Sequence, residues 1–139
     1  MSVTDLQRMT AAHEGRRIGY MHYPYGFGVA GPNEYDCSGL TMAAWAKARV
    51  TLPHNSAQQA VLLKAVPWKQ ANIAKMQPGD LVFFQGDGGD TVASVGHVAM
   101  YLEEYEGMHI IAQATNTQLG SEVIRVKKYE QPLFIGYVR

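Results

Sequence analysis

The pattern of apolar residues changes at Gly79, and this change limits the possible folds of the chain more than any other feature of the sequence. Before Gly79, apolar and small residues recur at helical spacing; after it, short alternating stretches are separated by turn-forming residues. The predicted helices cover residues 4–17, 36–50 and 56–65. The predicted strands cover residues 80–85, 95–102, 108–114, 122–126 and 133–138. Irregular chain is expected at residues 20–32 and 66–78. Helices followed by consecutive short strands favour an α+β fold with an antiparallel sheet.

The first predicted helix has a recognisable beginning. Thr4 followed by Gln7 fits a capping box, in which each residue satisfies a backbone N–H of the other. Leu6, Met9 and Ile18 form a modest apolar stripe. We therefore expect this stripe to face the core.

Composition excludes several classes of protein. The 139 residues suit a single domain covering residues 1–139. Lys+Arg and Asp+Glu are both 12, and this zero net charge disfavours a nucleic-acid-binding or membrane-surface protein. No basic region leading into an apolar run opens the chain, and no apolar stretch is long enough for a bilayer. We expect neither a secretion signal nor a membrane span.

Cys37 is the single cysteine, so an intrachain disulfide and a multi-cysteine metal site are excluded. It stands where a Gly-rich loop meets a predicted helix. The first turn of a helix offers free N–H groups and the positive end of the dipole, which stabilise a thiolate and a developing oxyanion. Cys37 is therefore a candidate nucleophile. The alternative is a small buried hydrophobe, as most lone cysteines are.

His97 is the candidate base for that thiol. It lies in an alternating strand, where we expect its side chain on the face shared by Val95 and Ala99. The neighbouring Gly96 would let another backbone or a ligand come close. The alternative is a core histidine hydrogen-bonded to the backbone. His13 and His54 are interpreted as solvated residues of a helix and a loop.

Four motifs follow one another along the chain. They are Asp36-Cys37-Ser38-Gly39-Leu40, then Leu52-Pro53 with Ser56 and Gln59, then Pro78-Gly79-Asp80-Leu81-Val82-Phe83-Phe84, then Gly96-His97-Val98-Ala99-Met100-Tyr101-Leu102. These motifs, in this order, resemble the NlpC family of cell-wall cysteine peptidases. The resemblance implies a reduced papain-like α+β fold, with the nucleophile Cys37 at a helix start and the base His97 on the packed sheet. It also implies that Tyr25, in a Pro-Tyr pair before the cysteine, helps to bind the oxyanion.

The resemblance implies a third polar residue that orients the histidine from the next strand. Gln113 and His109 compete for this role. His109 lies at a common family spacing after His97, whereas Gln113 precedes Ala114-Thr115-Asn116-Thr117, which resembles the segment that often follows the third residue. Residues 109, 111 and 113 share one strand face, so periodicity does not choose between them. We favour Gln113 on the motif match and attribute its displacement by four residues to a long turn at residues 103–107.

Other residues have less specific interpretations. Asp36 and Ser38 are expected to cap the helix, and the family resemblance adds a contact with substrate. Asp87 and Asp90, among glycines, resemble a weak calcium loop, but a solvated turn is favoured. We expect no metal and no cofactor. His54 stands where the family often has arginine, which leaves the specificity for the stem peptide open.

The resemblance implies hydrolysis of an amide bond in peptidoglycan stem peptides, typically between D-glutamate and the following diamino acid. The alternatives are a Cys–His amidase cutting another peptidoglycan amide bond, and a non-catalytic wall-binding module. The expected partner is a stem peptide, with no nucleic acid or membrane, and the expected state is a monomer. Without a secretion signal, we expect synthesis in the cytoplasm and action on the bacterial wall after phage release or delivery by a secretion machine, or as a domain of a longer secreted protein. The sequence does not indicate whether an inhibitor or immunity protein exists.

Overall fold

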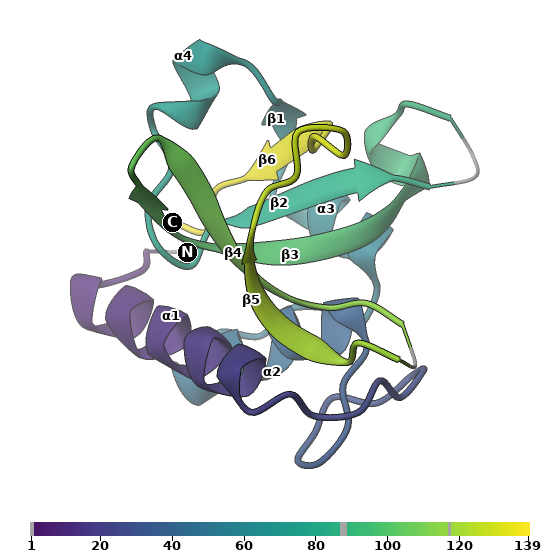
Figure 1. Cartoon of the computed structure of the whole chain (residues 1–139). Helices are drawn as coiled ribbons and strands as arrows, with labels where there is room; N and C mark the ends of the chain where they lie inside the picture. The colour runs from purple at the N-terminus through teal and green to yellow at the C-terminus, as the bar shows by residue number, and fades with distance from the viewer. Residues whose placement is uncertain (1, 87–88, 117) are drawn as a thin grey trace.

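The computed structural model describes residues 2–86, 89–116 and 118–139. Its centre is one antiparallel sheet with the strand order β1-β6-β2-β3-β4-β5 (Figure 1). The strands are β1 (Val66–Pro67), β2 (Leu81–Gln85), β3 (Val95–Tyr105), β4 (Met108–Ala114), β5 (Ser121–Arg125) and β6 (Phe134–Gly136). The helices are α1 (Asp5–Tyr20), α2 (Cys37–Lys47), α3 (Ser56–Leu62), α4 (Gln70–Ile73) and the 3-10 helix η1 (Val92–Ser94). The α+β fold with an antiparallel sheet is confirmed.

The main core lies between the sheet and the helices α1 and α2, which pack together on one side of it (Figure 1). Alternate residues of β3 point to this side, where they meet the inner face of α2. The fully buried side chains here include Leu40, Trp45, Phe83, Val98 and Met100. This packing fixes α2, and therefore its first residue, against the middle of the sheet.

The opposite face of the sheet is also covered in part. Val82, Ala99, Tyr101 and Ile111 form a second buried cluster there. Partly buried side chains that pack against this cluster are Trp68, Met76, Phe84, Ile124 and Val126. Residues 66–78, expected to be irregular, contribute to this cover and contain β1 and α4, so that expectation is wrong in part.

The helix α1 begins as predicted but buries a different face. Thr4 accepts a hydrogen bond from the Gln7 N–H, and Gln7 accepts one from the Thr4 N–H, which confirms the capping box. Leu6 and Met9, expected in the core, are 73% and 67% exposed, so this part of the prediction is wrong. Ile18 is fully buried, as expected. The other buried positions of α1 are Arg8, Ala11, Gly15 and Gly19, mostly small residues.

The β3–β4 hairpin is longer than predicted, and its turn is shorter. Strand β3 continues to Tyr105, so the turn consists of Glu106 and Gly107, both with positive φ, instead of residues 103–107. Such a pair suits a two-residue hairpin turn that matches the twist of the strands. A bulge between Tyr101 and Glu103 shifts the pairing of β3 with β4 by one residue. The additional strand residues therefore lengthen the hairpin.

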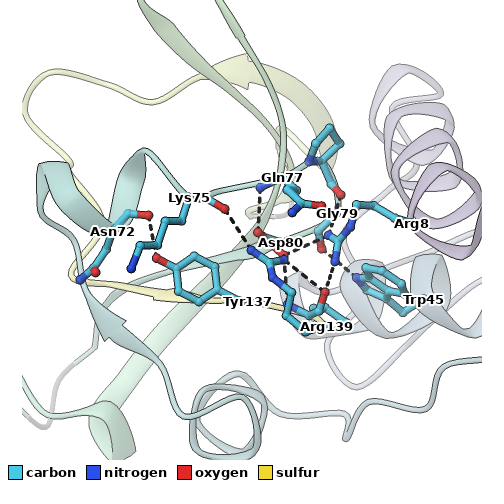
Figure 2. A network of polar contacts seen from close by, with 11 residues as sticks. Arg8, Trp45, Asn72, Lys75, Gln77, Gly79, Asp80, Tyr137 and Arg139 are labelled. Atoms are coloured by element: carbon cyan, nitrogen blue, oxygen red, sulfur yellow. Dashed lines mark hydrogen bonds and ion pairs between the residues drawn. The ribbon is translucent and has the colours of Figure 1, made fainter. Parts of the chain in front are cut away.

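A buried carboxylate joins the two ends of the chain (Figure 2). Asp80 has no exposed side-chain surface and forms ion pairs with Arg8 at 3.1 Å and with Arg139 at 2.8 Å. Arg8 also donates hydrogen bonds to the carbonyl oxygens of Pro78 and Val138. The network thus ties α1, the beginning of β2 and the last residues together.

Candidate active site

Cys37 is the first residue of α2, and Asp36 caps this helix. The Asp36 carboxylate accepts a hydrogen bond of 2.6 Å from the Gly39 N–H and one of 2.7 Å from the Gly28 N–H. The first of these bonds satisfies an N–H that the helix leaves free, and the second holds the preceding loop against the helix. The capping role expected of Asp36 is therefore confirmed.

The buried amide of Gln59 fixes the same helix end from α3. Its Nε2 donates to the carbonyl oxygens of Ser38 at 3.1 Å and of Pro53 at 2.8 Å, and its Oε1 accepts from the Thr41 hydroxyl at 2.8 Å. A buried amide with all these partners satisfied holds one geometry. The start of α2 is consequently rigid.

The Cys37 thiol is largely buried. Burial raises the pKa of the Cys37 thiol above its ordinary value, and the negative charge of Asp36 adds to the rise. Hydrogen bonds from the backbone N–H groups of Val98, Ser38 and Cys37 itself lower the pKa of the thiol without outweighing burial. The N–H groups of the helix start thus act in the predicted direction, but burial outweighs them and the net shift of the thiol pKa is upward.

A β-bulge at Gly96 places His97. The register pairs Phe84 with His97 but Gln85 with Val95, so Gly96 is the extra residue. Because of the bulge, Val95 joins the main core whereas His97 stands on the face of Ala99 and Phe84. The expectation that Val95 shares the face of His97 is therefore wrong.

The close approach predicted at Gly96 is confirmed. A Cβ at this position would lie 2.6 Å from the Gly86 Cα, a distance that no side chain tolerates. The two glycines let the neighbouring strands come together at the bulge.

Cys37 begins α2 and His97 lies on β3. The thiol lies against the N–H of Val98, the residue that follows His97. In the part of the chain that the structure describes, no hydrogen bond joins the thiol to the imidazole. The thiol and the imidazole are thus not hydrogen-bonded in the free protein, as is common before a substrate tightens a site.

His97 is hydrogen-bonded to Gln113, with 2.8 Å between Nε2 and Oε1. The oxygen of the amide accepts, so the imidazole carries a proton on Nε2 and leaves Nδ1 as a base when neutral. Burial lowers the pKa of His97, and the Gln113 hydrogen bond and the charges of Glu130 and Glu122 oppose this in part. The imidazole is accordingly neutral at pH 7.

His109, the other candidate, lies far along the hairpin. It pairs with Glu104, seven residues beyond His97 on β3, which at about 3.3 Å per residue is about 23 Å along the strand. Its ring contacts Trp68 and Tyr101 instead. The lengthened hairpin explains this position, because it carries His109 outward and leaves Gln113 within hydrogen-bonding distance of His97.

Tyr25 lies near the thiol on the loop before α2. Burial raises the pKa of Tyr25, and the charges of Cys37 and Asp36 raise it further. Its hydroxyl is therefore protonated at neutral pH and able to donate. The loop carrying it pairs with Tyr35 through isolated bridges, at Tyr25 and at Ala30.

Asp36 and Ser38 are less accessible than a contact with substrate would need. They are 7% and 5% exposed, and the Ser38 hydroxyl donates to Asp36 at 3.4 Å. Their role in substrate binding remains a prediction. For the weak calcium loop, Asp87 lies outside the described residues and Asp90 is exposed.

Two residues that complete the site, His54 and Glu122, do not follow from the sequence patterns. His54 is not a solvated loop residue, because its Nε2 lies 2.8 Å from the Asp36 carboxylate. Its place directly after Leu52-Pro53, where the resembling family often has arginine, was the available signal. Glu122 accepts a hydrogen bond of 3.3 Å from the Gln113 amide, and no local pattern marks it.

A groove of about 600 Å³ opens beside the His97 and Gln113 side chains. Its further walls include Leu119 of the β4–β5 turn and Tyr129 of the segment that follows β5. A second hollow, of about 740 Å³, surrounds His109. Of these two hollows, the first borders His97, and Cys37 is not among its lining residues.

In residues 2–86, 89–116 and 118–139, no helix has the length and apolar character needed to cross a membrane. Over the same residues, no group of three or more His, Cys, Asp or Glu side chains is arranged to hold a metal ion.

Known proteins resemble this chain in sequence. The family model described as the NlpC/P60 family matches residues 22–138. A protein of Listeria monocytogenes described as "Probable endopeptidase p60" is 37% identical over 78 residues, which are 56% of this chain and 14% of that protein. The chain thus spans less than a fifth of the length of the curated relatives it matches.

Solved structures share the fold. An NlpC/P60 family protein from Bacillus cereus superposes with a TM-score of 0.67 at 27% identity, over 91% of this chain and 39% of that one. RipD from Mycobacterium tuberculosis, described as a non-catalytic NlpC/p60 domain protein adapted to peptidoglycan binding, has a TM-score of 0.67 at 21% identity. That likeness covers 96% of this chain and 98% of RipD. With a family match over most of its length and the same fold, the chain belongs to the NlpC/P60 family.

Proposed function

We propose that this chain is a cysteine peptidase that hydrolyses an amide bond in peptidoglycan stem peptides. The observation that carries this proposal is the His97–Gln113 hydrogen bond, which leaves Nδ1 of a neutral imidazole as a base next to the strand residue that contacts the Cys37 thiol. The names of the Listeria and Mycobacterium relatives, probable endopeptidases, support it.

The proposed reaction begins from a neutral thiol and a neutral imidazole. Cys37 attacks the amide carbonyl while His97 takes the thiol proton at Nδ1, so no thiolate needs to accumulate beforehand. Tyr25 and the N–H of Cys37 donate to the tetrahedral oxyanion. The imidazolium then protonates the leaving amine, and water hydrolyses the thioester that remains. Gln113 holds the ring throughout.

The bond that we propose joins D-glutamate, through its γ-carboxyl, to the diamino acid that follows. The groove beside His97 and Gln113 is the proposed binding place for the stem peptide. We propose a monomer that needs no nucleic acid or membrane. Its proposed place of action is the bacterial cell wall, reached after phage release, through a secretion machine or within a longer secreted protein.

Digestion of purified muropeptides tests the proposal. Wild-type protein should release a product with a new free amine, identified by mass spectrometry, and Cys37→Ala should release none. The masses of the products identify the bond: cleavage between the sugar and the peptide, or in a bridge, would replace the endopeptidase by an amidase.

A non-catalytic wall-binding module is the competing function, favoured by RipD and by the missing hydrogen bond between Cys37 and His97. If wild type and Cys37→Ala bind peptidoglycan equally and leave every muropeptide intact, the peptidase proposal is refuted.

A further inference from the structure

We infer that Glu122 is a positioning residue that fixes the amide of Gln113 and, through it, the tautomer of His97. This inference rests on the proposed function, because it concerns the base of that reaction. Three side chains on neighbouring strands are linked by hydrogen bonds: His97 on β3, Gln113 on β4 and Glu122 on β5. Nε2 of His97 meets Oε1 of Gln113 at 2.8 Å, and Nε2 of Gln113 meets Oε1 of Glu122 at 3.3 Å.

The backbone holds this chain in register. Gln113 and Glu122 are directly opposite each other in the β4–β5 pair, so their side chains stand on the same face of the sheet. Ser121, the neighbour of Glu122, donates from its hydroxyl to the Ile18 carbonyl at 2.7 Å and accepts from the Tyr23 N–H at 2.8 Å. These bonds tie the start of β5 to the end of α1. Glu122 is therefore well placed to hold a partner in one orientation.

The chemistry of the three groups allows one arrangement of protons. A glutamine amide can turn by 180° and present either its oxygen or its NH₂ group to His97. An ionised carboxylate only accepts hydrogen bonds, so it selects the orientation with the NH₂ group toward Glu122. The amide oxygen must then face His97, which has to carry its proton on Nε2. Nδ1 keeps its lone pair and can receive the thiol proton.

Without Glu122, nothing in these contacts would favour that orientation over the other. A turned amide would donate to Nε2, and the neutral ring would carry its proton on Nδ1, where it could not act as the base. A neutral glutamine, unlike a carboxylate, leaves its own orientation open. Glu122, which binds the far side of the Gln113 amide, therefore fixes the orientation of that amide.

The negative charge of Glu122 also acts on the pKa of His97. Burial disfavours the imidazolium form of His97, and the charges of Glu130 and Glu122 favour it. Glu122 acts through the amide that it polarises, whereas no hydrogen bond connects Glu130 to Gln113 among the described residues. Lys127 also lines the groove. Glu130 is consequently the matched control for loss of charge alone.

The experiment compares Glu122→Gln with Glu130→Gln in the full chain. We expect the ¹⁵N resonances of the His97 ring to report the Nε2–H tautomer in wild type and in Glu130→Gln, and a mixture of tautomers in Glu122→Gln. We expect kcat on muropeptides to fall by about tenfold in Glu122→Gln with little change in KM, as when an imidazole loses an outer hydrogen-bond partner.

A double variant distinguishes a positioning role of Glu122 from a purely structural role in β5. In Gln113→Glu combined with Glu122→Gln, the carboxylate bonds His97 directly and position 122 can donate to it, so the Nε2–H tautomer and most of kcat should return. A merely structural role of Glu122 would not be rescued in this way. If Glu122→Gln does not fold, Glu122→Asp, which keeps the charge but shortens the side chain, takes its place.

The ring tautomer is measured without substrate, so the inference and the proposed function can fail separately. A tautomer shift in Glu122→Gln with no hydrolysis by wild type would refute the peptidase and leave the role of Glu122 intact. Unchanged tautomer and kcat in Glu122→Gln, or changes equal to those in Glu130→Gln, would overturn the inference.

Discussion

The imidazole of His54 is hydrogen-bonded to the carboxylate of Asp36, with 2.8 Å between Nε2 and Oδ1. Asp36 also accepts hydrogen bonds from the N–H groups of Gly39 and Gly28, so one carboxylate joins the helix that begins at Cys37 to the loops on both sides of it. His54 is therefore part of the support of Cys37, although it lies 17 residues further along the chain.

Removing Asp36 should cost more stability than removing His54. We expect Asp36→Ala to lower the free energy of unfolding by about 2 kcal/mol, the upper end for a helix N-cap, because two backbone N–H groups lose their acceptor. His54→Ala removes one hydrogen bond and should cost about 1 kcal/mol. Urea unfolding measures both, and His54→Arg, which keeps a donor, is the control. Equal losses for the two alanine variants would contradict the central place given to Asp36.

Alkylation of Cys37 should require alkaline pH. Because burial raises the pKa of the thiol, iodoacetamide should react more slowly than with free cysteine at pH 7.5, and the rate should still rise above pH 9. Stopped samples analysed by intact mass give the profile, with Cys37→Ala as the blank. A midpoint below that of free cysteine would instead indicate a thiolate–imidazolium pair in the free protein.

Activity should persist in mild acid. Burial lowers the pKa of His97, so the neutral base is present at pH values where an ordinary histidine would be protonated, and it is lost only as the pH falls through the lowered value. The acid limb of kcat/KM should accordingly have its midpoint below 6.5. Because the unfolded state binds a proton first, stability should also decline as the pH falls below 6.5. An acid limb above 6.5 would contradict the lowered pKa.

Gln113 and His109 should differ sharply on substitution. Gln113→Ala removes the hydrogen bond that orients the base and should reduce kcat by about 10- to 100-fold, much less than Cys37→Ala. His109→Ala removes a ring on the outer part of the hairpin and should leave kcat near wild type. Muropeptide turnover with matched melting temperatures decides between them. A large loss with His109→Ala and none with Gln113→Ala would reverse the assignment.

Where side chains alternate or repeat regularly, the sequence predicted the fold well. The strand at residues 108–114 has the predicted bounds, and the caps at Thr4 and Asp36 act as expected. The face of α1 was wrong because its contact with the core uses Ala11 and Gly15, whose small size gives little periodic signal, while Leu6 and Met9 stay exposed.

Features that depend on register or on distant parts of the chain could not be predicted. The bulge at Gly96 shifts Val95 to the other face, and a one-residue shift of this kind leaves no trace in an alternating pattern. The ambiguity between Gln113 and His109 had the same origin, since hairpin length depends on how far the pairing of β3 and β4 continues. His54 and Glu122 act through partners on other elements.

The network around Asp80 has a consequence for the topology of the chain. Arg8 and Arg139 bind the same carboxylate, so α1 and the last residue lie close together. A peptide linker from residue 139 back to the segment before α1 could therefore close the polypeptide into a ring. A circular permutant with new ends at the turn of Glu106 and Gly107 would keep the Asp80 network and the His97–Gln113 pair, and its groove would be unchanged.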